Sequence, residues 1–116
     1  MSVYDTAHAL ARELRQSDEY SNYARLKKAA YEDETNKALL DEYKRLQFRM
    51  QARAASGEQP PREEMDKLTR IASLLQLNED AREFIMAEFK FQRVISDIYK
   101  IIGEAAGIDI DSLLNA

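Results

Sequence analysis

Hydrophobic residues recur at helical spacing along nearly the whole chain, and polar capping residues divide this pattern into five segments. The first segment is expected to form a helix from about Val3 to Gln16, with Ser2 as its cap. Its apolar face comprises Val3, Ala7, Leu10, Ala11 and Leu14. Ser17 is a second cap, and the helix that follows it should reach about Tyr31.

The third helix is expected over residues 34–56, and it carries a narrow apolar seam. The seam residues are spaced four, three and four positions apart: Leu39, Tyr43, Leu46 and Met50. This heptad-like spacing is typical of two long helices that pack side by side. The one clear loop follows, where Gly57 can end the helix and the two prolines suit the start of the next.

The fourth helix should cover about Arg62 to Leu77, and Asn78 caps a fifth helix over residues 79–106. The residues of the fourth helix expected to face inward are Met65, Leu68, Ile71, Ala72 and Leu75. Gly107 is suited to end the fifth helix in the left-handed conformation. The tail, residues 109–116, is expected to fray, with Leu113 and Leu114 as the positions at which it could dock. The predicted fold is one all-α domain over residues 1–116, an antiparallel bundle of about five helices.

The fifth helix is too long and too apolar to be covered by one neighbour. At about 28 residues it measures ~42 Å, which exceeds the ~35 Å diameter of a compact chain of this length. Its main apolar face comprises Phe84, Phe91, Ile95, Ile98, Ile102 and Ala105. Further apolar residues flank this face on both sides: Ala81, Ile85, Phe89 and Tyr99, and Val94 and Ile101. The helix is either central in a monomeric bundle or shared between copies or sibling chains. The second interpretation is favoured, because exposed apolar patches of this size are rare on monomers.

Candidate catalytic and metal-binding chemistry is absent from the sequence. The chain has no cysteine, which excludes disulfides, thiolate metal sites, iron–sulfur clusters and cysteine nucleophiles. His8 is the one histidine, and it is interpreted as a partly buried packing residue of the first helix. The acidic clusters lie in first helical turns, where the helix dipole favours them. No phosphate-binding loop or nucleophile elbow occurs, so we expect no enzyme, no metal and no cofactor.

The distribution of charge limits the classes of partner that the protein is expected to bind. The net charge of −4 disfavours a general affinity for nucleic acid or anionic lipid. No apolar run approaches the ~18 residues of a membrane span, and no signal peptide is evident, so a cytoplasmic location is expected. Arg45, Arg49 and Arg53 nevertheless line one helix edge at four-residue spacing. They are either solvated or paired with acids, or they form a docking strip for an acidic protein surface or RNA phosphates. Only Phe48 is near enough to stack on bases, which weakens direct RNA binding.

The order of several motifs resembles a known family. A short helical pair precedes a long helix with Tyr43-x3-Gln47-x3-Gln51 and a Gly57-x2-Pro60 loop. The remaining matching positions are Leu68, Leu75, Asn78, the pair Ala87-Glu88, and the isoleucines Ile95, Ile98, Ile101 and Ile102. This order is similar to that of the YlbF/YmcA family of small helical bacterial proteins, and most similar to its YheA-like, UPF0342-type branch.

The resemblance implies a helical bundle that forms homodimers or higher oligomers. It also implies a link to competence, sporulation and biofilm regulation, through a complex that modulates ribonuclease Y and mRNA processing. Iron–sulfur binding by that complex cannot be carried over, because this chain lacks cysteine. The predicted function is therefore a non-enzymatic adaptor or regulator, with itself, sibling family proteins or ribonuclease-associated proteins as candidate partners. The alternatives are a direct RNA-binding protein that uses the arginines of the third helix, and a coiled-coil structural or chaperone-like protein.

Overall fold

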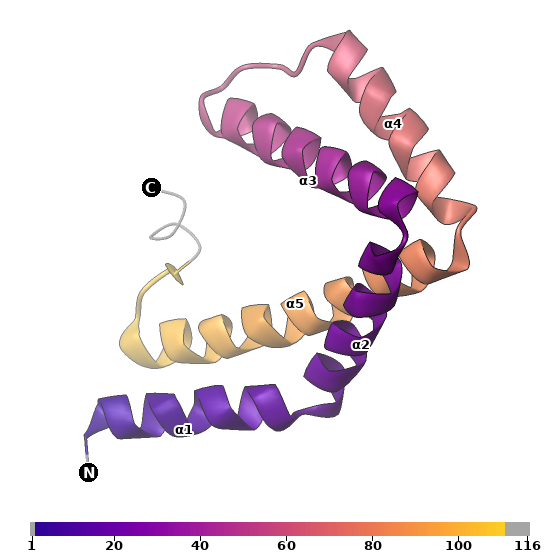
Figure 1. The fold of residues 1–116 in the computed structure, drawn as a ribbon. Helices are drawn as coiled ribbons and strands as arrows, with labels where there is room; N and C mark the ends of the chain where they lie inside the picture. The colour runs from indigo at the N-terminus through magenta and orange to yellow at the C-terminus, as the bar shows by residue number, and fades with distance from the viewer. Residues whose placement is uncertain (1, 111–116) are drawn as a thin grey trace.

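The computed structural model describes residues 2–110, which form five α-helices and no strand within that range (Figure 1). The helices are α1 Val3–Gln16, α2 Asp18–Glu32, α3 Glu34–Ala55, α4 Arg62–Gln76 and α5 Glu79–Ala106. The prediction of an all-α fold with five helices is confirmed, and each helix ends within a residue or so of its predicted bounds. Leu113 and Leu114, named above as docking positions of the tail, lie outside the described residues.

Short polar side chains set the junctions between the helices. Ser2, Ser17, Asp33 and Asn78 each accept a hydrogen bond from the backbone N–H three residues further on. Such caps satisfy N–H groups that have no partner within the helix. Because single capping residues separate α1, α2 and α3, the chain changes direction there without a long loop.

An aromatic cluster joins α2 to the first half of α5. Phe84 is fully buried, and its ring centroid lies 5.8 Å from that of Tyr23 and 5.7 Å from that of Tyr31. About two turns further along α5, the ring centroid of Phe91 lies 5.5 Å from that of Tyr20 and 5.4 Å from that of Tyr23. The two helices are therefore antiparallel, and α2 covers α5 as far as Phe91. Aromatic pairs of this kind each contribute about 0.5–1.5 kcal/mol beyond the burial of their area.

The core lies where α2, α3, α4 and α5 meet. Its buried apolar residues are Leu26, Ala30, Leu40, Leu46, Ile71, Leu75, Ala81, Phe84 and Ala87. The polar Asn36 is also buried, and its Nδ2 donates to Oδ1 of Asn78 at 3.0 Å. This hydrogen bond ties the start of α3 to the junction between α4 and α5. Because it satisfies a buried amide, its loss would leave a polar group without a partner.

Outside this core the molecule is open. Its Cα radius of gyration is 17.1 Å, against ~13 Å for a compact chain of this length. Two arms leave the core on the same side in Figure 1: the hairpin of α3 and α4, and the pair formed by α1 and the second half of α5. The Cα envelope measures 50 × 37 × 15 Å, so the thin direction is only about two packed helices deep. Many apolar side chains on the arms consequently lie at the surface.

The burial along α3 and α4 differs in detail from the sequence pattern. Of the predicted seam of α3, Leu46 is buried and Leu39, Tyr43 and Met50 are half-buried. Leu40, which the seam omits, is 1% exposed. The reason is that α3 contacts α2 along one part and α4 along another, so its buried side follows no single heptad stripe. Met65, expected to face inward, is 45% exposed because it lies in the first turn of α4, near the tip of the hairpin.

The chain reverses direction after α5. Gly107 has φ +70°, the left-handed conformation expected for a glycine that ends a helix. The backbone N–H of Ile108 donates to the carbonyl oxygen of Gly103 at 3.0 Å. Gly103 is itself required to be small, because a Cβ added there would lie 2.7 Å from the carbonyl oxygen of Ile108. Ile110 then lies against Gly103.

Candidate interaction surfaces

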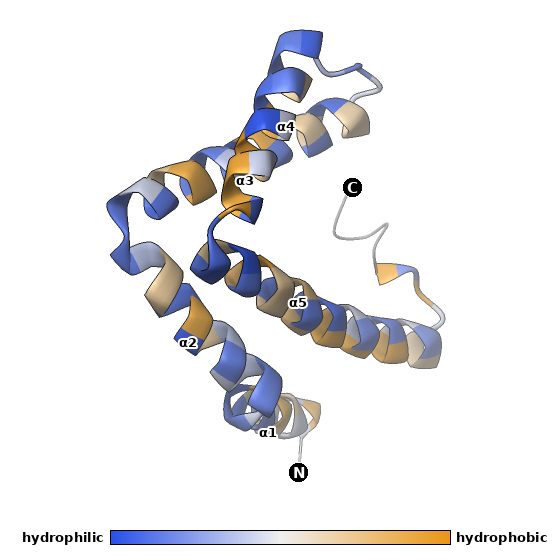
Figure 2. Ribbon diagram, turned by 90° about the vertical axis from the view of Figure 1, so that its right-hand side faces the viewer, coloured by the Kyte–Doolittle hydropathy of each residue, from blue (hydrophilic) through white to orange (hydrophobic). Residues whose placement is uncertain are grey.

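The second half of α5 carries an apolar surface that the chain leaves open. Within residues 92–106 only Gly103 is buried. Val94, Ile95 and Ile98 are half-buried, whereas Ile101 and Ile102 are 66% and 47% exposed. We call these five side chains the distal α5 face. The hydrophobic side of this helix can be followed in Figure 2.

The helix α1 is amphipathic, yet none of its residues is buried. Leu10 and Leu14 are half-buried, and Val3 is 85% exposed. In Figure 1, α1 and α5 run in opposite directions on the same side of the molecule, and the turned view of Figure 2 shows them diverging. His8 of α1 is exposed, so the interpretation of this residue as a packing histidine is wrong. The molecule turns α1 away from its core, and the apolar side of the helix has little to cover it.

The residues named from the sequence for core and interface thus fall into two groups. Phe84, Phe91 and Leu46 belong to the packed part of the chain. Ile95, Ile98 and Ile102 lie beyond the end of α2, on the distal α5 face. The structure therefore divides α5 into a first half that packs on α2 and a second half whose apolar side is covered only in part.

Lys44 connects α3 to the aromatic cluster. Its Nζ donates to a carboxylate oxygen of Glu88 at 2.9 Å and lies 5.1 Å from the ring centroid of Phe84. Partial burial by itself would lower the pKa of Lys44, but the hydrogen bond and the charge of Glu88 outweigh it and raise that pKa. The ammonium group therefore stays protonated at neutral pH. Figure 1 shows that the later part of α3 leaves α5 and runs beside α4.

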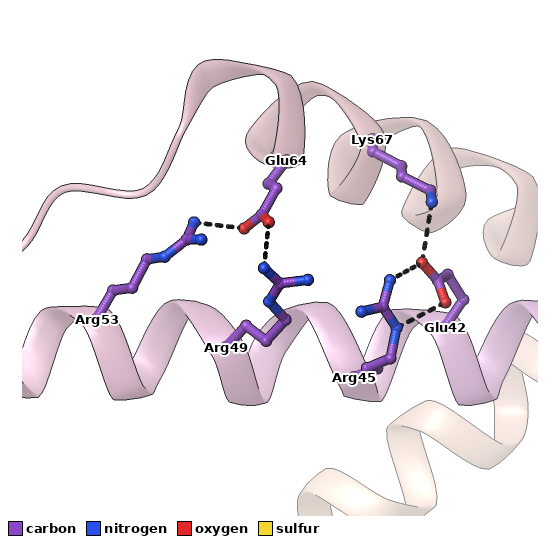
Figure 3. Close-up of polar contacts among 6 residues, drawn as sticks. All are labelled: Glu42, Arg45, Arg49, Arg53, Glu64 and Lys67. Atoms are coloured by element: carbon purple, nitrogen blue, oxygen red, sulfur yellow. Dashed lines mark hydrogen bonds and ion pairs between the residues drawn. The ribbon is translucent and has the colours of Figure 1, made fainter.

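The three arginines named as a candidate docking strip lie on the side of α3 that faces α4 (Figure 3). Arg49 and Arg53 share the carboxylate of Glu64 on α4, at 3.0 and 2.6 Å. This shared contact fastens the two helices of the hairpin together. We call Arg45, Arg49 and Arg53 the arginine strip.

Arg45 pairs differently from its two neighbours. It binds Glu42 on its own helix, and Lys67 of α4 binds the same carboxylate at 3.0 Å (Figure 3). The hydrogen bonds from Arg45, then from Lys67, lower the pKa of Glu42 from 4.5 to about 2. Glu42 is therefore ionised throughout the physiological pH range.

The network around the arginine strip keeps an excess of positive charge. Four cations, the strip and Lys67, face two carboxylates, Glu42 and Glu64. The side chains of Arg45 and Arg49 are 50% and 44% exposed, whereas that of Arg53 is 24% exposed. Arg45 and Arg49 consequently have donors within reach of a further acceptor, although each already has one partner.

Residues 2–110 contain no group of three His, Cys, Asp or Glu side chains placed to hold a metal ion. Over the same range no helix is long and apolar enough to cross a membrane. Sequence reasoning missed the Asn36–Asn78 bond and the Lys44–Glu88 pair, because each joins residues more than forty positions apart. Glu42, three residues before Arg45, could have been recognised from its spacing.

Two solved structures have a similar arrangement of helices. A protein of unknown function (DUF964) from Bacillus stearothermophilus matches with a TM-score of 0.76 at 18% identity, over 90% of this chain and 92% of that one. At that identity the likeness concerns the fold alone. A chain of the crystal structure of Bacillus subtilis RicA in complex with RicF matches with a TM-score of 0.60 at 25% identity, over 90% of this chain and 93% of that one.

Sequence relatives cover nearly the whole chain. A UPF0342 protein of Halothermothrix orenii is 36% identical over 102 residues, 88% of this chain and 86% of its own length. A UPF0342 protein of Desulfitobacterium hafniense is 37% identical over 105 residues, 90% of this chain and 85% of its own length. Neither name describes an enzyme. Residues 3–106 match the family model described as control of competence regulator ComK, YlbF/YmcA. The chain therefore belongs to the YlbF/YmcA family.

Proposed function

We propose that this protein is a non-enzymatic helical adaptor that associates with a second copy of itself and binds other protein chains. The observation that carries the proposal is the pair of uncovered apolar surfaces, the distal α5 face and α1. Burial of one isoleucine or leucine side chain contributes about 1.5–3 kcal/mol. Several such residues in one patch can therefore offset the cost of association, provided that the interface reaches the usual ~800 Å² per partner.

The family membership supports a regulatory setting. The family's description concerns control of the competence regulator ComK, and the similar solved chain belongs to a complex of RicA with RicF. These findings support a role in bacterial developmental regulation or RNA processing, with sibling family proteins or ribonuclease-associated proteins as partners. The protein would act in the cytoplasm. Any reaction in this setting is assigned to the partner protein.

Two other functions receive less support. Direct RNA binding would need a second aromatic side chain near Phe48 on which bases could stack, and the residues that follow Phe48 on the same side of α3 are Ala52 and Ala55. A coiled-coil structural or chaperone-like role would need the seam of α3 for another chain, but Leu46 of that seam is already buried within this one.

Light scattering on the purified protein tests self-association. At micromolar concentration we expect a mass of at least twice the 13.4 kDa of one chain. Ile102→Glu places a charge on the distal α5 face at an already exposed position, so it should shift the protein toward monomer without unfolding it. Gln92→Glu is the matched control, because it adds the same charge at another exposed position of α5. A monomeric parent protein, or an Ile102→Glu variant that associates as well as Gln92→Glu, would refute this part of the proposal.

Binding of other chains is tested by capture from native lysate with a tagged copy, with and without nuclease. Recovery of sibling family proteins or ribonuclease components after nuclease treatment is the expected result. Recovery that depends on intact RNA would instead favour the RNA-binding alternative. Recovery of the protein alone would limit the proposal to self-association.

A further inference from the structure

The outer half of α3 has a second apolar surface, separate from the distal α5 face. Phe48 is 73% exposed, although it lies in the middle of a long helix. Ala52 and Ala55 follow at four- and three-residue spacing, which places them on the same side of α3 as Phe48. Together with Gln51 and Ala54 these residues line a shallow hollow of about 650 Å³. We call Phe48, Ala52 and Ala55 the Phe48 face.

The position of this face in the fold explains why it has no cover. Glu64 and Lys67 of α4 contact the side of α3 that carries the arginine strip. The contact between Lys44 and Glu88 marks where α5 meets α3, one turn before Phe48. Past that point α3 is covered on the α4 side only, and its last buried residue is Leu46. A large aromatic side chain beside two alanines would let another helix approach closely and pack around the ring.

The charges on the α3–α4 arm indicate what kind of helix could bind to the Phe48 face. Arg45 precedes Phe48 by three residues and Arg49 precedes Ala52 by three, so the arginine strip runs along one edge of the Phe48 face. The strip and Lys67 carry four positive charges against the two negative charges of Glu42 and Glu64. On the opposite edge Gln51 is uncharged, and Lys44, four residues before Phe48, is paired with Glu88. An occupant that carries carboxylates along one edge would therefore complement the surface.

The distribution of charge along the chain supports the same conclusion. The segment from Lys44 to Arg70, the outer part of the α3–α4 arm, contains seven basic and four acidic residues, and the acidic Asp41 and Glu42 precede it. The rest of the chain contains ten basic and seventeen acidic residues. Two copies that met through their Phe48 faces would bring two positive outer segments together, which disfavours a symmetric contact at this surface.

We propose that the Phe48 face and the arginine strip together form a docking site for an amphipathic helix of a partner protein, apolar along one side and acidic along the adjoining edge. The proposal rests on the adaptor function above and names the chemistry of the partner. Phe48 would fill the apolar side of the incoming helix, and Arg45 and Arg49 would bind its carboxylates. RNA is the less suitable ligand, because the alanines beside Phe48 provide no second ring on which a base could stack.

The test uses the full-length protein and a labelled synthetic helical peptide of about 18 residues, with leucine and alanine on one face and glutamate along its edge. Fluorescence anisotropy should show binding that weakens as salt is raised. A second peptide with lysine in place of each glutamate should bind at least about tenfold more weakly. Equal binding of the two peptides would overturn the proposal.

Substitutions on α3 locate the site. Ala52→Glu places a negative charge within the Phe48 face and should weaken peptide binding by about tenfold or more. Gln47→Glu adds the same charge at an exposed position elsewhere on α3, and it should change binding by no more than about twofold. Phe48→Ala should weaken binding without a charge change, and helix content by circular dichroism should be unaltered because the side chain is exposed. Binding unaffected by both Ala52→Glu and Phe48→Ala would overturn the assignment.

Two further readouts separate this proposal from its rivals. A single-stranded oligouridine, offered under the same conditions, should bind more weakly than the acidic peptide, and the opposite order would replace the peptide site with a phosphate site. Light scattering of Ala52→Glu should give the same mass as the parent protein. If the mass falls instead, the Phe48 face is part of the contact between copies and the proposal of a separate partner fails. Self-association through α5 is tested independently by Ile102→Glu.

Discussion

The ammonium of Lys44 lies 2.9 Å from the carboxylate of Glu88, and this ion pair holds the α3–α4 arm against α5. The side chains are 38% and 19% exposed, so solvent screens the pair only in part. The same ammonium lies over the buried ring of Phe84. One side chain thus contacts both the aromatic cluster and the base of the arm.

We expect Lys44→Met to lower the free energy of unfolding by about 1 kcal/mol, because partial exposure limits the pair to the range of surface ion pairs plus a cation–π contact. Glu88→Gln should have a smaller or similar effect. Urea unfolding of the two single variants and the double variant gives the coupling between the residues. A coupling energy indistinguishable from zero would mean that the pair contributes nothing beyond packing.

Phe84→Ala and Phe89→Ala form a matched pair on one helix. Phe84 is 0% exposed, so its truncation should cost about 3–5 kcal/mol through lost burial and a cavity between α2 and α5. Phe89 is 72% exposed, and its truncation should change the free energy of unfolding by no more than about 0.5 kcal/mol. Both values come from urea unfolding at one protein concentration, with light scattering to confirm the same oligomeric state. Similar costs for the two variants would contradict the assignment of the core.

The glycines after α5 and after α3 differ in what surrounds them. Gly57→Ala and Gly107→Ala should each cost about 1 kcal/mol, because their φ angles of +79° and +70° strain any side chain while no atom lies within 4 Å of the added Cβ. Gly103→Ala meets the carbonyl oxygen of Ile108 at 2.7 Å, so it should displace the chain reversal itself.

Hydrogen exchange distinguishes these two effects. In Gly103→Ala the amide of Ile108, which donates to the carbonyl of Gly103, should lose protection, while amides near Phe84 keep theirs. In Gly57→Ala the amide of Ile108 should exchange as in the parent protein. Unchanged exchange at Ile108 in Gly103→Ala would show that the reversal tolerates the added methyl group.

The carboxyl of Glu42 provides a pH-dependent observable. Its pKa in the folded state is about 2, lowered chiefly by the hydrogen bond from Arg45 and then by that from Lys67, against an ordinary value of 4.5. Because the folded pKa is depressed, the stabilisation by this ion pair is complete above about pH 4.5 and is lost as the pH falls toward 2. NMR titration of the Glu42 side chain should give a midpoint near the lower value, and Arg45→Gln should raise it. A midpoint that does not respond to Arg45→Gln would show that the pair does not persist in solution.

Helix boundaries followed from the sequence because their causes are local. Ser17 and Asn78 cap the helices that begin beside them, and Gly107 ends α5 within the same turn. Which residues are buried was harder to predict, because burial depends on which helices pack together. Leu40 and Leu39 are adjacent and equally apolar, and only the contact of α3 with its neighbours makes Leu40 the buried one. The same limit applied to Asn36, whose partner Asn78 lies in a distant segment.

The exposed apolar and basic surfaces were predictable in kind and less so in extent. The excess apolar width of α5 indicated an interface, but not that α2 would stop at Phe91 and leave Ile101 and Ile102 exposed. The arginine strip was visible from its four-residue spacing, whereas its sharing of Glu64 required the hairpin geometry. The sequence identified Phe48 only as an aromatic residue on which bases could stack. Its exposure could not be predicted, because it depends on where α5 departs from α3.

The 15 Å depth of the molecule has a consequence for its behaviour in the cell. A chain only about two helices deep cannot enclose the apolar sides of its own arms, so association would add to the stability that the core of one copy provides. Its melting temperature should then rise with protein concentration. Copies that find no partner would be the ones that proteases remove, and the amount of this protein would follow the amount of complex.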